Sequence, residues 1–292
     1  MYNEIIKKIR IEKGMKQKEV YLNVVSKSFY SDFEAGKNSI EVSKFMGLLS
    51  NLGISFNEFE YYQKENEINL EEKIDKLYNQ GQFEELYSFY LENHENKQVT
   101  LRYLAMKSYL LVLITNTNFY KFSREPFREI ISEVENYKTW TLKEISLAKL
   151  ILLSSSESEK EQAKTMFNRL VLELGKYKKL DHTIYYKEMC DLLFNRVQSL
   201  LVISEIQEAI ETGKQYKIIS EESDDLHLMI QYKFINILLN LYLDFTVYQE
   251  EMNSFLDQIK LERSSEFNFY KIIFRIHEEK AKNYFTRYQI NC

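Results

Sequence analysis

The chain has 292 residues, which is enough for about two domains. It contains only 7 Gly and 1 Pro, whereas α/β enzymes and β-sandwiches need glycine in phosphate loops and tight turns, and proline in loops and edge strands. This composition argues against both classes and predicts an all-α fold of helices joined by short turns. The net charge of −5 argues against nucleic-acid binding by the chain as a whole, so such a role must belong to one region.

Motifs of catalysis and metal binding are absent from the sequence. Cys190 and Cys292 lie far apart without CxxC or CxxH spacing, so we expect neither a disulfide framework nor a zinc site. The four histidines are isolated, and no P-loop, GxGxxG or GxSxG motif occurs. We therefore predict that the protein is not an enzyme and needs no cofactor and no metal. A redox role of either cysteine stays open.

The apolar runs of the sequence are short. Residues 110–114 form one of the longest, far below the ~20 residues that a membrane span needs. The first residues contain no apolar stretch of signal-peptide length. We expect no contact with a membrane and a location in the cytoplasm, whose reducing conditions suit two unpaired cysteines.

Charge and glycine are both unevenly distributed. Residues 1–50 hold nine basic and six acidic side chains, a local charge of +3, so the other 242 residues carry −8. Four of the seven glycines lie within the first 53 residues. We therefore predict two domains: a compact, weakly basic domain over residues 1–65 and a longer helical domain over residues 66–292.

The first domain is predicted to contain five short helices. Gly14 ends the first, and Ser26 is a favourable N-cap for a third that runs from Lys27 to Glu34. Ser55 and Glu58 have the spacing of a capping box at the start of a fifth helix. The other expected starts are near residue 16 for the second helix and residue 40 for the fourth. Short helices separated by tight turns are typical of DNA-binding helix-turn-helix domains.

Residues 5–60 resemble the helix-turn-helix of the phage-repressor type, from Arg10 and Gln17 through Glu34-x-Gly36 to Gly53. This resemblance implies that Arg10 and Glu34 form a structural ion pair. It also implies a set of residues at the interface with double-stranded promoter DNA. These are Lys16, Gln17 at a phosphate, Lys27, Ser28 and Phe29 at the start of the recognition helix, Asp32 within it, and Lys37 as a clamp on the backbone.

Asp32 departs from this pattern, because relatives usually carry a basic residue at its position. A carboxylate repels the phosphates unless it accepts a hydrogen bond from cytosine N4. Asp32 therefore predicts DNA binding that is either weaker or more selective for a base. A five-helix core without any DNA function is the alternative.

Residues 68–292 predict a degenerate helical-repeat domain. Residues 74–90 resemble one tetratricopeptide-type helix pair, with one helix ending near Gly81 and the next beginning at Phe83. Residues 241–252 show a similar pattern. No fixed period holds across the amphipathic segments between them. Those segments cover residues 99–115, 126–137, 141–154, 158–175, 184–201 and 203–219. We expect the neighbouring repeats to bury each other's apolar faces and to leave an extended groove.

The domain order and the chain length resemble the Rgg/MutR branch of peptide-responsive regulators of Gram-positive bacteria. The stretch around Trp140 and Glu144 and the stretch around Phe194 and Asn195 are similar to passages of that branch, although Trp140 comes slightly late. The resemblance implies a short signalling peptide as partner. It also implies a homodimer whose repeat domains supply the dimer contacts.

The expected peptide site lies on the apolar helix around residues 229–243. Tyr232, Asn236 and Asn240 are spaced by four residues and share one face. A buried amide without a partner costs about 1–3 kcal/mol, so this stripe predicts a ligand backbone as its partner. Asn195 could act similarly and Arg196 could meet a carboxylate. Alternatively, these side chains bond to loops between helices.

The sequence thus predicts a DNA-binding transcriptional regulator that senses a short peptide. Two alternatives stay open. One is a helical-repeat protein that acts through protein contacts, with a vestigial first domain, which Asp32 and the modest local charge would favour. The other is a regulator that responds to a metabolite or to a protein antagonist.

Overall fold

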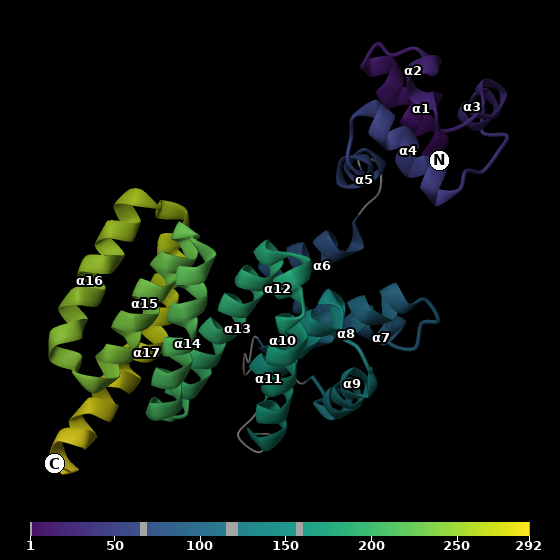
Figure 1. Ribbon diagram of the computed structural model, residues 1–292. Helices are drawn as coiled ribbons and strands as arrows, with labels where there is room; N and C mark the ends of the chain where they lie inside the picture. The colour runs from purple at the N-terminus through teal and green to yellow at the C-terminus, as the bar shows by residue number, and fades with distance from the viewer. Residues whose placement is uncertain (1, 65–68, 115–121, 156–159, 292) are drawn as a thin grey trace. The chain divides into compact units, whose positions relative to one another are not determined.

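The structure is a computed structural model that describes residues 2–64, 69–114, 122–155 and 160–291. Every regular element within those residues is an α-helix (Figure 1), which confirms the predicted fold class. The chain forms two compact units, residues 1–85 and 86–292. The predicted domain boundary at residues 65 and 66 lies outside the described residues and stays a prediction. None of the described helices is long and apolar enough to cross a bilayer.

The first unit begins with the five predicted helices. They are α1 (Tyr2–Glu12), α2 (Gln17–Tyr21), α3 (Lys27–Glu34), α4 (Val42–Leu52) and α5 (Phe56–Lys64). A sixth helix, α6 (Leu70–Asn79), follows, and α7 (Phe83–Asn93) extends across the division between the units. The positions of α6 and α7 agree with the predicted turn at Gly81, whose φ is +71°.

Local signals fix the ends of these helices. Gly14 and Gly36 have φ angles of +66° and +75°, in the left-handed region that glycine adopts without strain. The Ser26 hydroxyl accepts a hydrogen bond from the Phe29 backbone N–H at 3.2 Å, as an N-cap does. Ser55 and Glu58 form the predicted capping box, in which the Glu58 carboxylate accepts from the Ser55 backbone N–H at 2.6 Å.

The first five helices enclose one hydrophobic core. Each of α1 to α5 contributes a fully buried side chain, for example Ile9, Val20, Phe33, Leu48 and Phe59. Gly47 on α4 lets the turn after α2 approach closely, since a Cβ there would lie 2.9 Å from Val24 Cγ1. The core therefore holds α3 in place with its outer face free.

The second unit consists of helices that pack on one another, with α8 packed on α10 and α10 on α11. Its helices after α7 are α8 (Val99–Ile114), α9 (Glu125–Asn136), α10 (Leu142–Ser154), α11 (Lys160–Gly175), α12 (Tyr177–Leu180), α13 (His182–Val202), α14 (Ile206–Ser223), α15 (Leu226–Leu243), α16 (Phe245–Glu262) and α17 (Ser264–Asn291). From α13 onward each helix packs against the next, and α15 also packs against α13 and α17. The six predicted amphipathic segments correspond to α8 to α11, α13 and α14, whereas α12 and α17 were not predicted.

Two details explain how helices pack in this unit. Gly213 on α14 faces α15 so closely that a Cβ would lie 2.5 Å from Leu239 Cδ1. Trp140 is buried; its indole N–H donates to the Val134 carbonyl at 3.0 Å, and the Arg169 guanidinium lies 4.1 Å from the centre of its ring. The tryptophan therefore joins the end of α9 to α11.

Candidate functional site

The outer face of α3 carries the residues expected to contact DNA. Lys27 and Ser28 at its start are exposed, whereas Phe29 is half-buried and packs against the core of the first unit. Less of the Phe29 side chain is therefore available to a DNA groove than of its two neighbours. Asp32 lies one turn after Ser28 on the same face of the helix.

The side chains of Arg10 and Glu34 meet between α1 and α3. Arg10 Nε and Nη2 donate to the two carboxylate oxygens of Glu34 at 2.6 and 3.0 Å, while Nη1 donates to the Met15 carbonyl at 3.0 Å. Burial by itself raises the pKa of Glu34, but the hydrogen bonds from Arg10 and Gln17 outweigh it and lower that pKa. Glu34 is therefore a buried anion whose charge is compensated within the unit.

Gln17, expected at a phosphate, takes part in the same network. Its Nε2 donates to Glu34 Oε2 at 2.7 Å, which uses one of its two amide N–H donors. Lys16 is the N-cap of α2, and its backbone N–H donates to the Glu19 carboxylate at 2.7 Å. A phosphate contact by Gln17 must therefore use the second N–H, and it stays a prediction.

Asp32 has an internal partner that the sequence did not reveal. The ammonium group of Lys37 lies 3.2 Å from Asp32 Oδ1; the Lys37 side chain is 70% exposed and that of Asp32 is half-buried. Lys37 was expected to contact a phosphate. Without DNA, its positive charge instead compensates the negative charge of Asp32 on the outer face of α3. The sequence signal that could have predicted this pair is the spacing of five residues between Asp32 within α3 and Lys37 after its end.

The expected peptide-binding residues fall into two separate groups. Asn195 and Arg196 line a small cavity between α10, α11 and α13, together with Lys149 and Ser199. Arg196 Nη2 pairs with Glu208 at 2.7 Å, while its Nε is buried and has no hydrogen-bond partner among the described residues. Its guanidinium is thus partly engaged already.

The stripe on α15 differs from the expectation. Asn236 is exposed, whereas we expected a buried amide that needs a partner, and Asn240 is half-buried. Tyr232 stacks on Tyr216 of α14, with ring centres 6.1 Å apart. The apolar residues between them do pack inward, but the amides lie where α15 meets solvent. Because none of the three lines the cavity of Asn195, a single shared site stays a prediction.

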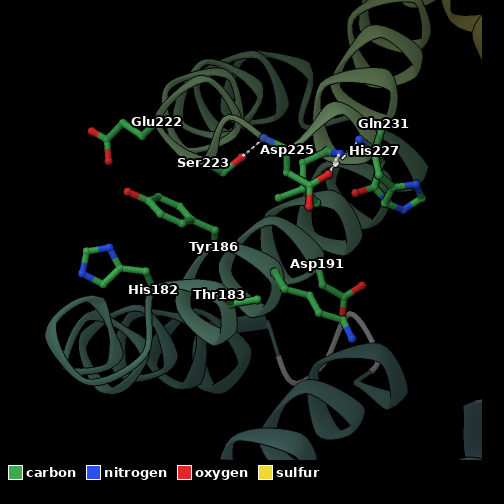
Figure 2. Close-up of a pocket in the computed structure, with 11 residues that line it drawn as sticks. His182, Thr183, Tyr186, Asp191, Glu222, Ser223, Asp225, His227 and Gln231 are labelled. Carbon is green, nitrogen blue, oxygen red and sulfur yellow. Dashed lines mark hydrogen bonds between the residues drawn. The ribbon is translucent and has the colours of Figure 1, made fainter.

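A larger pocket, of about 630 Å³, lies between the N-terminal parts of α13 and α15, beside the end of α14 (Figure 2). Sequence reasoning missed it, although it combines His182, Tyr186 and Asp191 from α13 with His227 and Gln231 from α15. No group of three His, Cys, Asp or Glu side chains suited to a metal ion exists within the described ranges. We call it the α13–α15 pocket.

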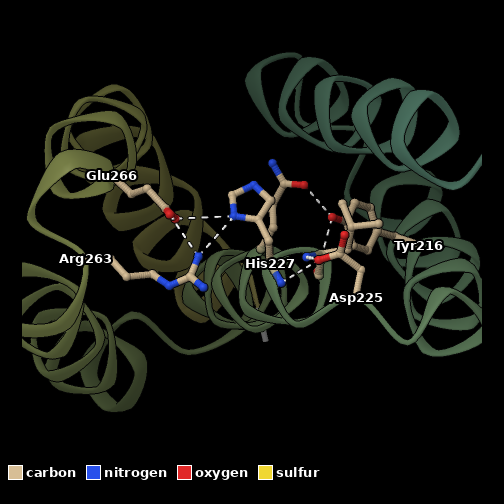
Figure 3. A network of polar contacts seen from close by, with 7 residues as sticks. Tyr216, Asp225, His227, Arg263 and Glu266 are labelled. Atoms are coloured by element: carbon tan, nitrogen blue, oxygen red, sulfur yellow. Dashed lines mark hydrogen bonds and ion pairs between the residues drawn. The ribbon is translucent and has the colours of Figure 1, made fainter. Parts of the chain in front are cut away.

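The wall of this pocket on α15 belongs to a wider polar network (Figure 3). The Tyr216 hydroxyl donates to Gln231 Oε1 at 2.5 Å. On the other side, Arg263 Nη1 lies 3.3 Å from His227 Nδ1 and 2.9 Å from Glu266 Oε1. This network fixes the start of α15 to the helices on both sides of it.

Comparison with known proteins agrees with this architecture. Residues 6–59 match the sequence profile of the helix-turn-helix family. No curated protein matches the chain by sequence. Among solved structures, a candidate transcriptional regulator from Listeria monocytogenes EGD-e is similar with a TM-score of 0.76 and 21% identity, covering 96% of this chain and 98% of that one.

Two further structures are similar over nearly their full length. The SHP pheromone receptor Rgg2 of Streptococcus dysgalactiae has a TM-score of 0.69 at 16% identity, over 94% of this chain and 99% of its own. The complex of PrgX with cCF10 has a TM-score of 0.68 at 14% identity, over 96% and 99%. Residues 6–59 thus match the helix-turn-helix family, within a chain that has the fold of Rgg2 and PrgX.

Proposed function

We propose that this protein is a DNA-binding transcriptional regulator whose second unit senses a short signalling peptide. The observation that carries the proposal is the combination of a helix-turn-helix domain with the full-length fold of a pheromone receptor. The exposed Lys27 and Ser28 at the start of α3 support the DNA-binding half. The likeness to a receptor and to a PrgX complex supports the peptide-sensing half.

The regulator acts in the cytoplasm as a homodimer on a promoter site with two-fold symmetry. One recognition helix reads only a few base pairs, so two are needed for useful specificity. Peptide binding biases the spacing or orientation of the two DNA-binding units, by shifting the population between two global states. A peptide can do so only if its affinity for the two states differs.

The DNA-binding half is tested by titrating the full chain with the promoter fragments upstream of its own gene and of the adjacent gene. Lys27→Ala should weaken binding and lower the salt dependence by about one released counterion, because it removes one phosphate or base contact. Lys73→Ala, an exposed lysine on α6, is the matched control and should change neither. Absent or salt-insensitive binding of the unmodified protein contradicts this half of the proposal.

The peptide-sensing half is tested by calorimetric titration with short hydrophobic peptides encoded beside the gene. Asn236→Ala and Asn240→Ala should each weaken binding, by about 1 kcal/mol for a lost hydrogen bond. Asn253→Ala, an exposed asparagine on α16, should leave the affinity unchanged. Unmodified affinity in both stripe variants contradicts the predicted site, and no heat with any peptide contradicts peptide sensing.

A further inference from the structure

The outer face of α3 carries few groups that can tell one base from another. Ser28 and Ser31 are exposed, and so is Ala35 at the C-cap, while Asp32 lies among them at the spacing of one helix face. A serine hydroxyl both donates and accepts, so it can bond to any base, and an alanine methyl offers only apolar contact. An ionised Asp32, in contrast, accepts hydrogen bonds and donates none.

A group that only accepts distinguishes the base edges of the major groove. Cytosine N4 and adenine N6 donate there, whereas guanine and thymine present only acceptors. Adenine N6 lies between two acceptors, its own N7 and O4 of the paired thymine, and both repel a carboxylate. Cytosine N4 has an acceptor on one side only, O6 of the paired guanine. Cytosine is therefore the base that suits Asp32 best.

Lys37 weakens the repulsion between this carboxylate and the phosphates of DNA. Its ammonium group lies 3.2 Å from Asp32 Oδ1, so the pair as a whole is neutral. Because an exposed ion pair contributes little to stability, Lys37 can move to a phosphate at small cost while Asp32 turns to a base. Glu34, the other carboxylate of α3, is buried against Arg10 and does not face the DNA.

We propose that Asp32 selects cytosine in each half of the promoter site, by accepting a hydrogen bond from its N4 amino group in the major groove. This inference rests on the proposed function, because it needs α3 to be the recognition helix. The two serines then add affinity for many sequences, and Asp32 sets the preferred base at one position of each half-site. Of weaker binding and base selection, which the sequence left open, the neutral pair with Lys37 favours selection.

The test measures the preference between bases, because a change of charge on α3 alters the affinity for every sequence. The full chain selects from a duplex library with about 20 randomised base pairs, which accommodates two half-sites about 10 base pairs apart. The unmodified protein should enrich cytosine about tenfold at one position of each half-site. Asp32→Ala should abolish this preference and leave the preferences at the other positions in place.

Asp32→Asn gives a sharper result, since it changes the hydrogen-bonding pattern and keeps the size of the side chain. An asparagine amide both donates and accepts, which matches N7 and N6 of adenine. The preferred base at that position should therefore change from cytosine to adenine. The matched control is Glu41→Gln, which removes a carboxylate from a second exposed ion pair of this unit, with Lys44 at 3.1 Å. Cytosine should stay preferred in this control.

Sequence-selective binding without a cytosine preference, or a preference that Asp32→Ala leaves undiminished, would overturn the proposal while DNA binding by the protein stands. A change to adenine that also occurs in Glu41→Gln would show an effect of charge rather than a direct contact, and it would overturn the proposal too. If the unmodified protein enriches no sequence at all, both the proposal and the DNA-binding half of the function are wrong.

Discussion

At the scale of single residues, two buried ionisable groups show how the fold controls charge. Glu34 stays ionised because Arg10 and Gln17 donate to it. His277 on α17 is instead kept neutral, because it is only 1% exposed and burial lowers its pKa to about 4. Its Nδ1 forms a hydrogen bond with the Tyr242 hydroxyl at 2.8 Å. One group is buried as a paired anion and the other as a neutral base.

His277 should make the stability of the second unit depend on pH. Its pKa is lower in the folded chain, about 4 against an ordinary 6.5, so the unfolded chain binds a proton first as the pH falls. Stability is therefore complete above about pH 6.5 and is lost as the pH falls toward 4, by about 2 kcal/mol between pH 7 and pH 5. Urea unfolding at both pH values measures this loss.

The matched variant is His277→Gln, which can still form a hydrogen bond with Tyr242 but does not titrate. Its loss of stability between pH 7 and pH 5 should be smaller by the same amount. Identical pH dependence of the two proteins would show that protonation of His277 is not coupled to unfolding.

Asp32 is a second case at the scale of single residues, because its negative charge affects how α3 binds the phosphates of DNA. Asp32→Arg should raise the affinity for promoter DNA and steepen its salt dependence, since the change removes a negative charge and frees Lys37 from its ion pair. Titration at several salt concentrations measures both. Unchanged affinity at every salt concentration would show that Asp32 does not face the DNA.

At the scale of helices, close packing depends on where small residues lie. The contact of α14 with α15 is set by Gly213, whose missing Cβ leaves room for Leu239. In a helix interior, alanine is favoured over glycine by about 1 kcal/mol. Gly213 therefore lowers the helix propensity of α14. We infer that the close approach of α14 and α15 contributes more to stability than this loss of propensity costs.

Gly213→Ala should consequently destabilise the protein, by about 1 kcal/mol after overpacking of 1–3 kcal/mol is offset by helix propensity. In a Leu239→Ala background the same change should become stabilising, since the atom 2.5 Å from the new Cβ is gone. Urea unfolding of the four proteins measures this reversal. A change of the same sign and size in both backgrounds would contradict the packing argument.

At the scale of the whole molecule, the chain divides into two compact units. The buried cluster that α1 to α5 enclose runs from Ile6 to Phe59, and the helices from α13 onward pack on one another. We therefore expect two thermal transitions in calorimetry rather than one. The ion pair of Arg10 with Glu34 offers a way to perturb one of them.

Arg10→Met should lower only the transition of the first unit. Leaving a buried carboxylate unpaired costs about 3–5 kcal/mol, which corresponds to more than about 10 °C for a unit of this size. The double variant Arg10→Met with Glu34→Leu should recover most of the loss, because no charge is left buried. If both transitions shift together in Arg10→Met, the units do not unfold separately.

Much of this architecture could be predicted from the sequence because it depends on near neighbours. Glycines at positions 14 and 36 and the Ser26 cap determined the ends of the first helices, and apolar periodicity located most helices of the second unit. α17 escaped prediction because its hydrophobic residues are spread around the helix, with Ile272 and Ile276 exposed. The expected stripe on α15 had the right spacing, yet Asn236 lies in solvent.

What the sequence by itself determined is therefore the helical class, the helix-turn-helix unit and the succession of helices. Only the tertiary structure decided which face of each helix is buried and which distant side chains meet, such as Tyr216 with Gln231 or Tyr242 with His277. The physical reason is that caps and periodicity act over a few residues. The rotation of one helix against another follows instead from how side chains remote in sequence pack together.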